Sequence, residues 1–107
     1  MKLSLVPLIA FLAAPVIADE WACNGNWRDG GLKRLSFTFN GYCEDRWGQC
    51  FLDALRSRRL TVHNWQCWKR GDGKWQVDFS TTAGVAWSAN QAIESVTHNW
   101  RGCWPNQ

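Results

Sequence analysis

Hydrophobic and polar residues alternate in three stretches of the chain and recur at three- and four-residue steps in two others. The alternation over 32–40, 61–69 and 74–80 predicts three strands, each buried on one side. Helical spacing of apolar residues predicts one helix from Cys43 to Leu60 and a second that starts in a capping box at Ser88 and runs to Trp100. The pair Asp72-Gly73 between the second and third strands predicts a tight hairpin.

The remaining segments complete a fold class. Residues 19–31 show no regular period, so we expect an irregular segment with a turn at Asp29-Gly30-Gly31. One short last strand is expected after Gly102. The resulting order, β-α-β-β-α-β, is that of a ferredoxin-like split β-α-β fold. Two amphipathic helices cover one face of a sheet, which predicts a two-layer α+β sandwich with an uncovered second face.

A leader precedes this domain. Met1-Lys2 provides a positive start, residues 3–18 are nearly all apolar, and the polar pair Asp19-Glu20 follows. This is the pattern of a secretory signal peptide. The apolar run is shorter than the roughly 20 residues of a membrane span and holds two prolines. We therefore expect residues 1–18 to be removed and residues 19–107 to be secreted as a single small domain.

All five cysteines lie in the expected mature chain, as is usual for disulfides in small secreted proteins. A bridge between Cys23 and Cys103 would close most of the chain and stabilise it by about 4–5 kcal/mol. Cys43 and Cys50 lie two turns apart on the expected helix, too far to bridge each other. We predict Cys23–Cys103 and Cys50–Cys67 with Cys43 left over, and a disulfide dimer through the odd cysteine as an alternative. Spacing alone leaves other pairings open.

Tryptophan is the most unusual component, with nine residues in the chain. Large aromatic side chains usually supply much of a small core. The predicted inner faces of strands and helices carry four of them: Trp47, Trp65, Trp75 and Trp100.

Two other tryptophans are expected on the outer face of the sheet. Successive residues of a strand point to opposite faces of the sheet, so Trp68 faces away from the side of Cys67, and Trp104 away from the side of Cys103. Exposed aromatic side chains among amides and cations are typical of faces that bind protein or sugar. The candidate binding residues are Trp68, Trp104, Arg34, Lys74 and Gln66.

The net charge and the absence of known motifs reduce the number of function classes that the sequence supports. The net charge of +3 falls to about +2 without Lys2, too little to predict a nucleic-acid partner. The mature chain has no nucleophile elbow, phosphate loop or zinc-type cysteine pair, so no catalytic residue, metal or cofactor is expected. An alternative is a secreted ribonuclease in which His63 and His98 act as the acid–base pair, with Glu44 or Glu94.

The leader, the short mature chain and the few cysteines resemble small secreted effectors of plant-pathogenic fungi. Trp21-Ala22-Cys23 is similar to the aromatic-x-Cys start of mildew and rust effectors, in which a late cysteine, here Cys103, pairs with the early one. A second resemblance is to killer-toxin-like and necrosis-inducing effector domains. It rests on Gln49-Cys50 before residues 51–55, on the strand at 75–79 and on the helix at 92–96. These families define no catalytic residues.

The resemblance implies a virulence protein that binds a host protein, outside the host cell or after translocation into it, and modulates immunity or cell death. One alternative is a cationic antimicrobial or killer-like toxin, since positive charge with surface tryptophan favours membrane interfaces. Another is a glycan binder. We expect a monomer unless the odd cysteine links two copies.

Overall fold

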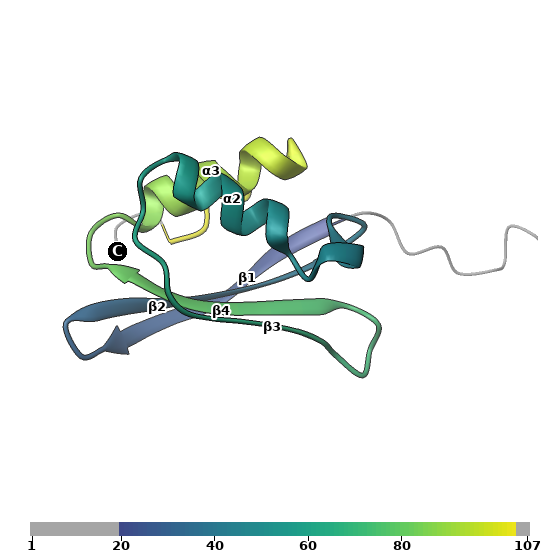
Figure 1. Ribbon diagram of the computed structural model, residues 1–107, viewed down its shortest axis with the longest axis horizontal. Coiled ribbons are helices and arrows are strands. Elements are labelled where there is room, and N and C mark those ends of the chain that lie inside the picture. The colour runs from purple at the N-terminus through teal and green to yellow at the C-terminus, as the bar shows by residue number, and fades with distance from the viewer. Residues whose placement is uncertain (1–19, 105–107) are drawn as a thin grey trace, which may run out of the picture.

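The computed structural model describes residues 20–104, which form four strands, two α-helices and one 3-10 helix (Figure 1). The expected leader and its cleavage site lie outside the described residues. In chain order the elements are β1 (Glu20–Asp29), β2 (Leu32–Asn40), η1 (Glu44–Arg46), α2 (Gln49–Ser57), β3 (His63–Lys69), β4 (Trp75–Thr82) and α3 (Ala86–Thr97).

The strands form one antiparallel sheet in the order β1-β2-β4-β3, and both helices cover the same face (Figure 1). The two-layer α+β architecture is thereby confirmed, but the ferredoxin-like order is wrong. The chain runs β-β-α-β-β-α, so each half is a hairpin followed by a helix. The two hairpins join through their inner strands, β2 and β4.

β1 replaces the irregular segment that the sequence predicted at 19–31. Its pairing with β2 shifts between Cys23 and Gly25, which is a β-bulge. A bulge inserts one residue and reverses the side that the following residues face. Trp21 therefore pairs with Phe39 on the helix side, whereas Trp27 pairs with Arg34 on the opposite side. This reversal hides the period of two in the sequence.

The core lies between the sheet and the two helices. Phe37 in β2 is fully buried and packs edge-on against Phe51 of α2, with ring centroids 5.3 Å apart. The ring of Phe79 in β4 also packs edge-on against Phe37, with centroids 6.5 Å apart. Complete burial of such a side chain contributes about 1.5–3 kcal/mol, so Phe37 and Phe79 each stabilise the fold by an amount of this order.

The predicted long helix is broken near its start, which corrects the second disulfide. Cys43, Trp47 and Gly48 all have left-handed backbone angles, and α2 begins only at Gln49. The chain folds back on itself there, bringing the Cα atoms of Cys43 and Cys50 to 6.0 Å in a disulfide. The predicted Cys50–Cys67 bridge is therefore wrong, and Cys67 is the free cysteine.

Gly48 has two physical reasons to be glycine. Its φ of +71° is strained for other residues, and an added Cβ would lie 3.3 Å from the sulfur of Cys67 and 3.5 Å from the Phe39 ring.

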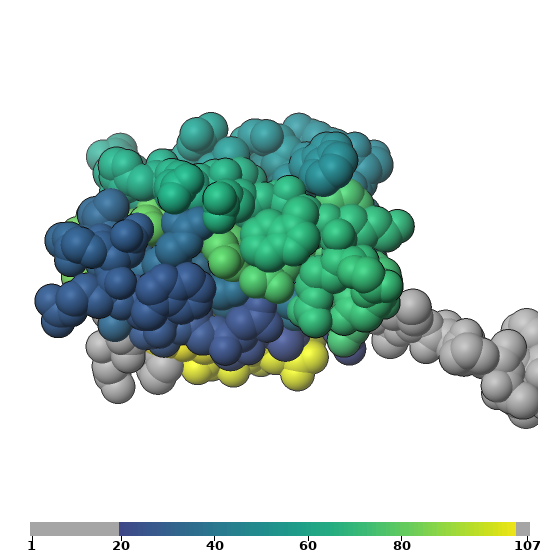
Figure 2. Space-filling model, turned by 90° about the horizontal axis from the view of Figure 1, so that it is seen from below, coloured from purple at the N-terminus to yellow at the C-terminus, as the bar shows by residue number. Residues whose placement is uncertain are grey.

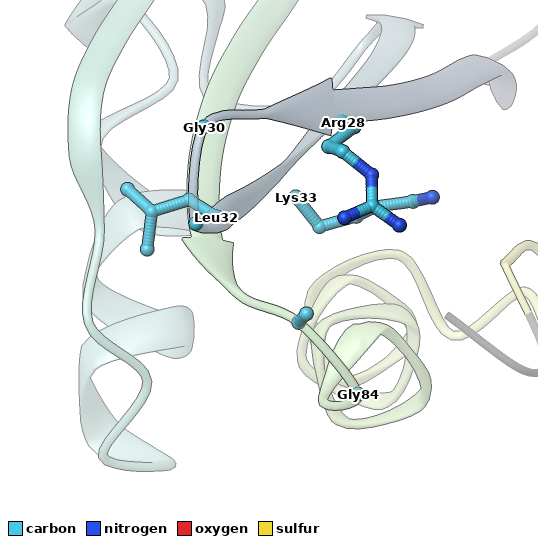
Figure 3. Close-up of a pocket in the computed structure, with 7 residues that line it drawn as sticks. Arg28, Gly30, Leu32, Lys33 and Gly84 are labelled. Carbon is cyan, nitrogen blue, oxygen red and sulfur yellow. The ribbon is translucent and has the colours of Figure 1, made fainter.

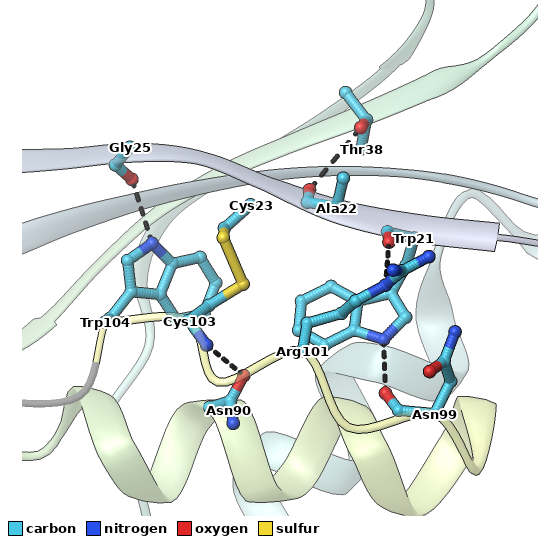
Figure 4. Close-up of a disulfide and its surroundings, with 10 residues drawn as sticks. All are labelled: Trp21, Ala22, Cys23, Gly25, Thr38, Asn90, Asn99, Arg101, Cys103 and Trp104. Carbon is cyan, nitrogen blue, oxygen red and sulfur yellow. Dashed lines mark hydrogen bonds between the residues drawn. A yellow bond between two sulfur atoms is a disulfide. The ribbon is translucent and has the colours of Figure 1, made fainter.

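The C-terminal segment is irregular where a last strand was expected. It runs over the inner side of β1 and is held there by the predicted Cys23–Cys103 disulfide, which is confirmed, with Cα atoms 5.9 Å apart (Figure 4). The indole N–H of Trp104 donates to the Gly25 carbonyl at 3.1 Å, and the Arg101 guanidinium donates to the Trp21 carbonyl at 3.0 Å. Asn90, which the expected capping box had placed at the helix start, is buried within α3 and accepts a hydrogen bond from the Cys103 N–H.

Candidate functional site: the uncovered face of the sheet

The outer face of the sheet, opposite the helices, carries three rows of side chains defined by the strand pairing. Directly paired residues of antiparallel strands project to the same side. Each row crosses β1, β2, β4 and β3 in turn. The rows are Trp27, Arg34, Ser80 and His63; Gly25, Ser36, Asp78 and Gln66; and Ala22, Thr38, Gln76 and Trp68.

Hydrogen bonds join the middle of this face into a polar floor centred on Ser36 and Asp78. The Ser36 hydroxyl donates to one Asp78 carboxylate oxygen at 2.6 Å. The Gln76 amide donates to the same oxygen at 3.0 Å and to Ser36 at 3.2 Å. Asn24, the extra residue of the bulge, donates to the Ser36 hydroxyl at 3.0 Å. These bonds link β1, β2 and β4 and hold the carboxylate in one orientation.

Arg34 extends the floor toward β3. Although no helix covers it, its side chain is only 7% exposed. Its guanidinium donates to the Ser80 hydroxyl at 2.9 Å, to the Gln66 side-chain oxygen at 2.8 Å and to the Asn64 carbonyl at 3.2 Å. The planar fork of arginine suits such a multiple role. The Ser80 hydroxyl in turn donates to the Asp29 carboxylate at 2.5 Å.

The far end of the face is closed by an ion pair. The Lys74 ammonium lies 2.8 Å from the Glu20 carboxylate, joining the start of β4 to the start of β1. Hydrogen bonding and charge attraction from Lys74 lower the pKa of the Glu20 carboxyl. Glu20 has a cationic partner, whereas the Asp29 and Asp78 carboxylates accept hydrogen bonds from neutral side chains. The face therefore carries charges of both signs rather than a patch of one sign.

Two exposed tryptophans stand at diagonally opposite corners of this floor. Trp27 lies on one edge strand and is 45% exposed, and Trp68 lies on the other edge strand and is 38% exposed. Spacings of about 4.8 Å between strands and 3.3 Å along them put their backbones roughly 20 Å apart. Along the β1 edge beside Trp27, Gly25 and Ala22 contribute almost no side chain. Figure 2 shows this face, with the green segment of β4 set in a shallow hollow between β3 and the first hairpin.

The structure brings together most of the residues predicted for binding. Arg34, Gln66 and Trp68 share the outer face, and Lys74 lies at its end. Trp104 does not belong to it and is corrected. It is 4% exposed and packs on the helix side of the sheet, 6.3 Å from Phe37, because the C-terminal segment is not a strand.

The tryptophans expected in the core divide equally. Trp75 is buried and Trp65 is half-buried against Phe79, as expected. Trp47 and Trp100 are 59% and 45% exposed, so their prediction is wrong. The cause is local, because each residue was expected inside a helix but lies outside the helix that forms. α2 begins after Trp47, and α3 ends at Thr97, before Trp100.

Sequence reasoning missed Trp27 as a surface residue of this face. The signal was present in the turn at Asp29-Gly30-Gly31. Had that turn been extended as a hairpin, Trp27 would have been placed opposite Arg34. Asn24, Ser36 and Asp78 were also missed, since small polar residues on a strand carry no distinctive pattern.

The residues of the ribonuclease alternative are not brought together. His63 lies in β3 on the outer-face side, whereas His98 ends α3 in the helix layer. Neither forms a hydrogen bond to a carboxylate in residues 20–104. In that same range, no group of three or more metal-binding side chains gathers.

Cys67 is a poor candidate for a reactive or cross-linking thiol. It pairs with Val77 on the helix side, and burial raises its pKa to about 11. A thiol that ionises so late is a weak nucleophile at neutral pH. The geometry does not favour the disulfide dimer expected as an alternative.

Comparisons with protein-family models, with curated proteins and with solved structures found no match. Within the described part of the chain, no helix has the length and apolarity needed to cross a membrane. The functional argument therefore depends on the geometry of the outer face.

Proposed function

We propose that the protein is a secreted effector-type protein that binds a host protein through the outer face of its sheet and so modulates immunity or cell death. The observation that supports this is the pairing of two exposed tryptophans, Trp27 and Trp68, with a polar floor that is already ordered. Tryptophan is enriched among the residues that dominate interface energies. A rigid floor reduces the entropy lost on binding.

The floor offers both donors and acceptors to a partner. Among the described residues, the Gln66 amide N–H₂ and the second Asp78 carboxylate oxygen form no hydrogen bond within the protein. Both groups are therefore available to a bound molecule. Mixed charges on the face favour a partner surface that is polar and carries no strong charge of one sign. They give less support to the membrane-toxin alternative, which needs a cationic surface beside the aromatic residues.

The test is affinity capture from host extract with the disulfide-bonded protein and three variants. Trp27→Ala and Trp68→Ala each remove a corner of the face, and the captured partner should be lost or bound at least tenfold more weakly. Trp87→Ala is the matched control, because Trp87 is 41% exposed but lies on α3. Equal capture by all four proteins would contradict the proposal.

A glycan is a second candidate, favoured by a floor of hydrogen-bonding groups between two aromatic side chains. Retention on insoluble chitin or glucan that depends on Trp27 and Trp68 would support it over a host protein.

A further inference from the structure

A cavity of about 360 Å³ lies at the end of the molecule where the β1–β2 turn meets the loop between β4 and α3 (Figure 3). Arg28 and residues 30–33 of the hairpin line one side, and Ala83 and Gly84 line the other. Gly30, Gly31 and Gly84 contribute backbone only, and a Cβ added at any of them would meet nothing within 4 Å. The cavity is thus open and bordered by peptide groups.

Two cations stand together at this cavity without a counterion. Arg28 and Lys33 are direct partners in the β1–β2 pairing, and Figure 3 shows their side chains side by side. Like charges directly opposite each other in a sheet are destabilising. Within residues 20–104 neither side chain forms an ion pair or hydrogen bond, and no acidic residue lines the cavity. The adjacent Asp29 is turned away and holds Ser80 on the outer face.

The start of α3 adds positive potential at the same end. The helix begins at Ala86, two residues after Gly84, and its N-cap, Val85, makes no side-chain cap. Its first turn holds no acidic residue. Free N–H groups at a helix start and the helix dipole, equivalent to roughly half a positive charge, both favour an anion.

We propose that this cavity binds a phosphate or sulfate group. Two side-chain cations and a helix start complement a compact dianion, and binding one relieves the repulsion between Arg28 and Lys33. The volume lies at the lower end of the roughly 300–1,000 Å³ range of small-molecule sites, which leaves room for a small ester around the anion. Arg28 and Lys33 lie on the helix side of the sheet, so the site is separate from the outer face and does not depend on its function.

The test is a titration of the ¹⁵N-labelled, disulfide-bonded protein with inorganic phosphate at constant ionic strength, followed by amide chemical shifts. Saturable shifts are expected at Gly30, Gly31, Gly84 and Ala86. Arg28→Gln and Lys33→Gln should each weaken binding about tenfold or more, as expected for loss of a charge-assisted contact. Arg58→Gln, an exposed cation at the end of α2, is the control and should bind like the wild type.

Because the substitutions remove a repulsion, both variants should remain folded, with melting temperatures no lower than that of the wild type. Shifts that rise linearly without saturation, or equal affinity in the wild type and both variants, would overturn the proposal. Phenyl phosphate distinguishes a free anion from a phosphate group carried on a larger molecule. Equal affinity for inorganic phosphate and phenyl phosphate supports a free anion, whereas clearly tighter binding of phenyl phosphate supports a group carried on a larger molecule.

Discussion

The two faces of β2 are both buried but are held in order by different forces. On the helix side, Leu35, Phe37 and Phe39 are at most 1% exposed and pack against other apolar side chains. On the outer side, Arg34 and Ser36 are at most 7% exposed and are held by hydrogen bonds to β1, β3 and β4. Packing depends on volume, whereas hydrogen bonding depends on direction. A single strand therefore combines a face that supplies stability with a face that supplies fixed polar geometry.

The largest loss of stability is expected from removal of the Cys23–Cys103 disulfide, which holds the C-terminal segment on the inner side of β1. In the chain-entropy model, an 80-residue loop predicts that Cys23→Ser with Cys103→Ser lowers the free energy of unfolding by about 4.5 kcal/mol. Urea denaturation under non-reducing conditions measures it. Cys43→Ser with Cys50→Ser opens only a seven-residue separation and should cost about half as much. The reverse order would contradict this assignment.

The second-largest loss of stability is expected at the centre of the inner face. Phe37→Ala should lower the free energy of unfolding by about 4 kcal/mol, because Phe37 is fully buried and surrounded by aromatic rings. Phe37→Leu, which keeps most of the volume, should cost about 1.5 kcal/mol or less by the same denaturation measurement. Equal losses for the two variants would show that packing volume does not govern this face.

The outer face should respond to loss of partners rather than of volume. Arg34→Met should cost about 2 kcal/mol, because it leaves the acceptors on Ser80, Gln66 and Asn64 without their donor. Arg34→Lys should recover little of this, since one ammonium cannot replace the planar fork. Full recovery of thermal stability by lysine would show that charge alone is required.

Trp68→Ala should separate function from stability on that face. Trp68 is an edge-strand residue and is 38% exposed, so its loss should lower the free energy of unfolding by less than about 1 kcal/mol. Partner binding should nevertheless weaken at least tenfold. A Trp68→Ala protein that fails to fold would contradict its role as a binding residue.

The smallest effect on stability is expected from ionisation of the Cys67 thiol. Burial raises its pKa from 9.0 to about 11, so the folded state favours the neutral thiol. The associated stabilisation is complete below pH 9 and is lost as the pH rises through 11. Iodoacetamide at pH 8.5 should therefore modify Cys67 in the folded protein at least tenfold more slowly than in urea. Mass spectrometry measures both rates. Equal rates in the folded and unfolded protein would show that the Cys67 thiol is exposed to solvent.

Sequence patterns were sufficient where the local period is unbroken. β2 and β4 alternate without interruption, so their inner and outer residues were predicted correctly. β1 was missed because its bulge reverses the alternation between Cys23 and Gly25. The Cys43–Cys50 bridge was missed because an ideal helix has no left-handed residues, whereas Trp47 and Gly48 both adopt that conformation.

The candidate site was recovered in part for a similar reason. Trp68, Gln66 and Arg34 follow directly from strand alternation. Trp104 was misplaced because its position is set by contacts with β1, far away in the sequence, including the bond to Gly25. Contacts of this kind leave no local period.

The fastening of the C-terminal segment onto β1 has a consequence for the order in which the molecule matures. A ribosome adds Cys23 to the chain 80 residues before Cys103, so β1 has no covalent anchor until the segment that carries Cys103 exists. The Cys43–Cys50 link joins neighbours and can form well before that. In the interval, Cys23 is free to form a disulfide with the wrong cysteine, and productive maturation then depends on a thiolate that attacks the wrong disulfide and releases Cys23 by exchange.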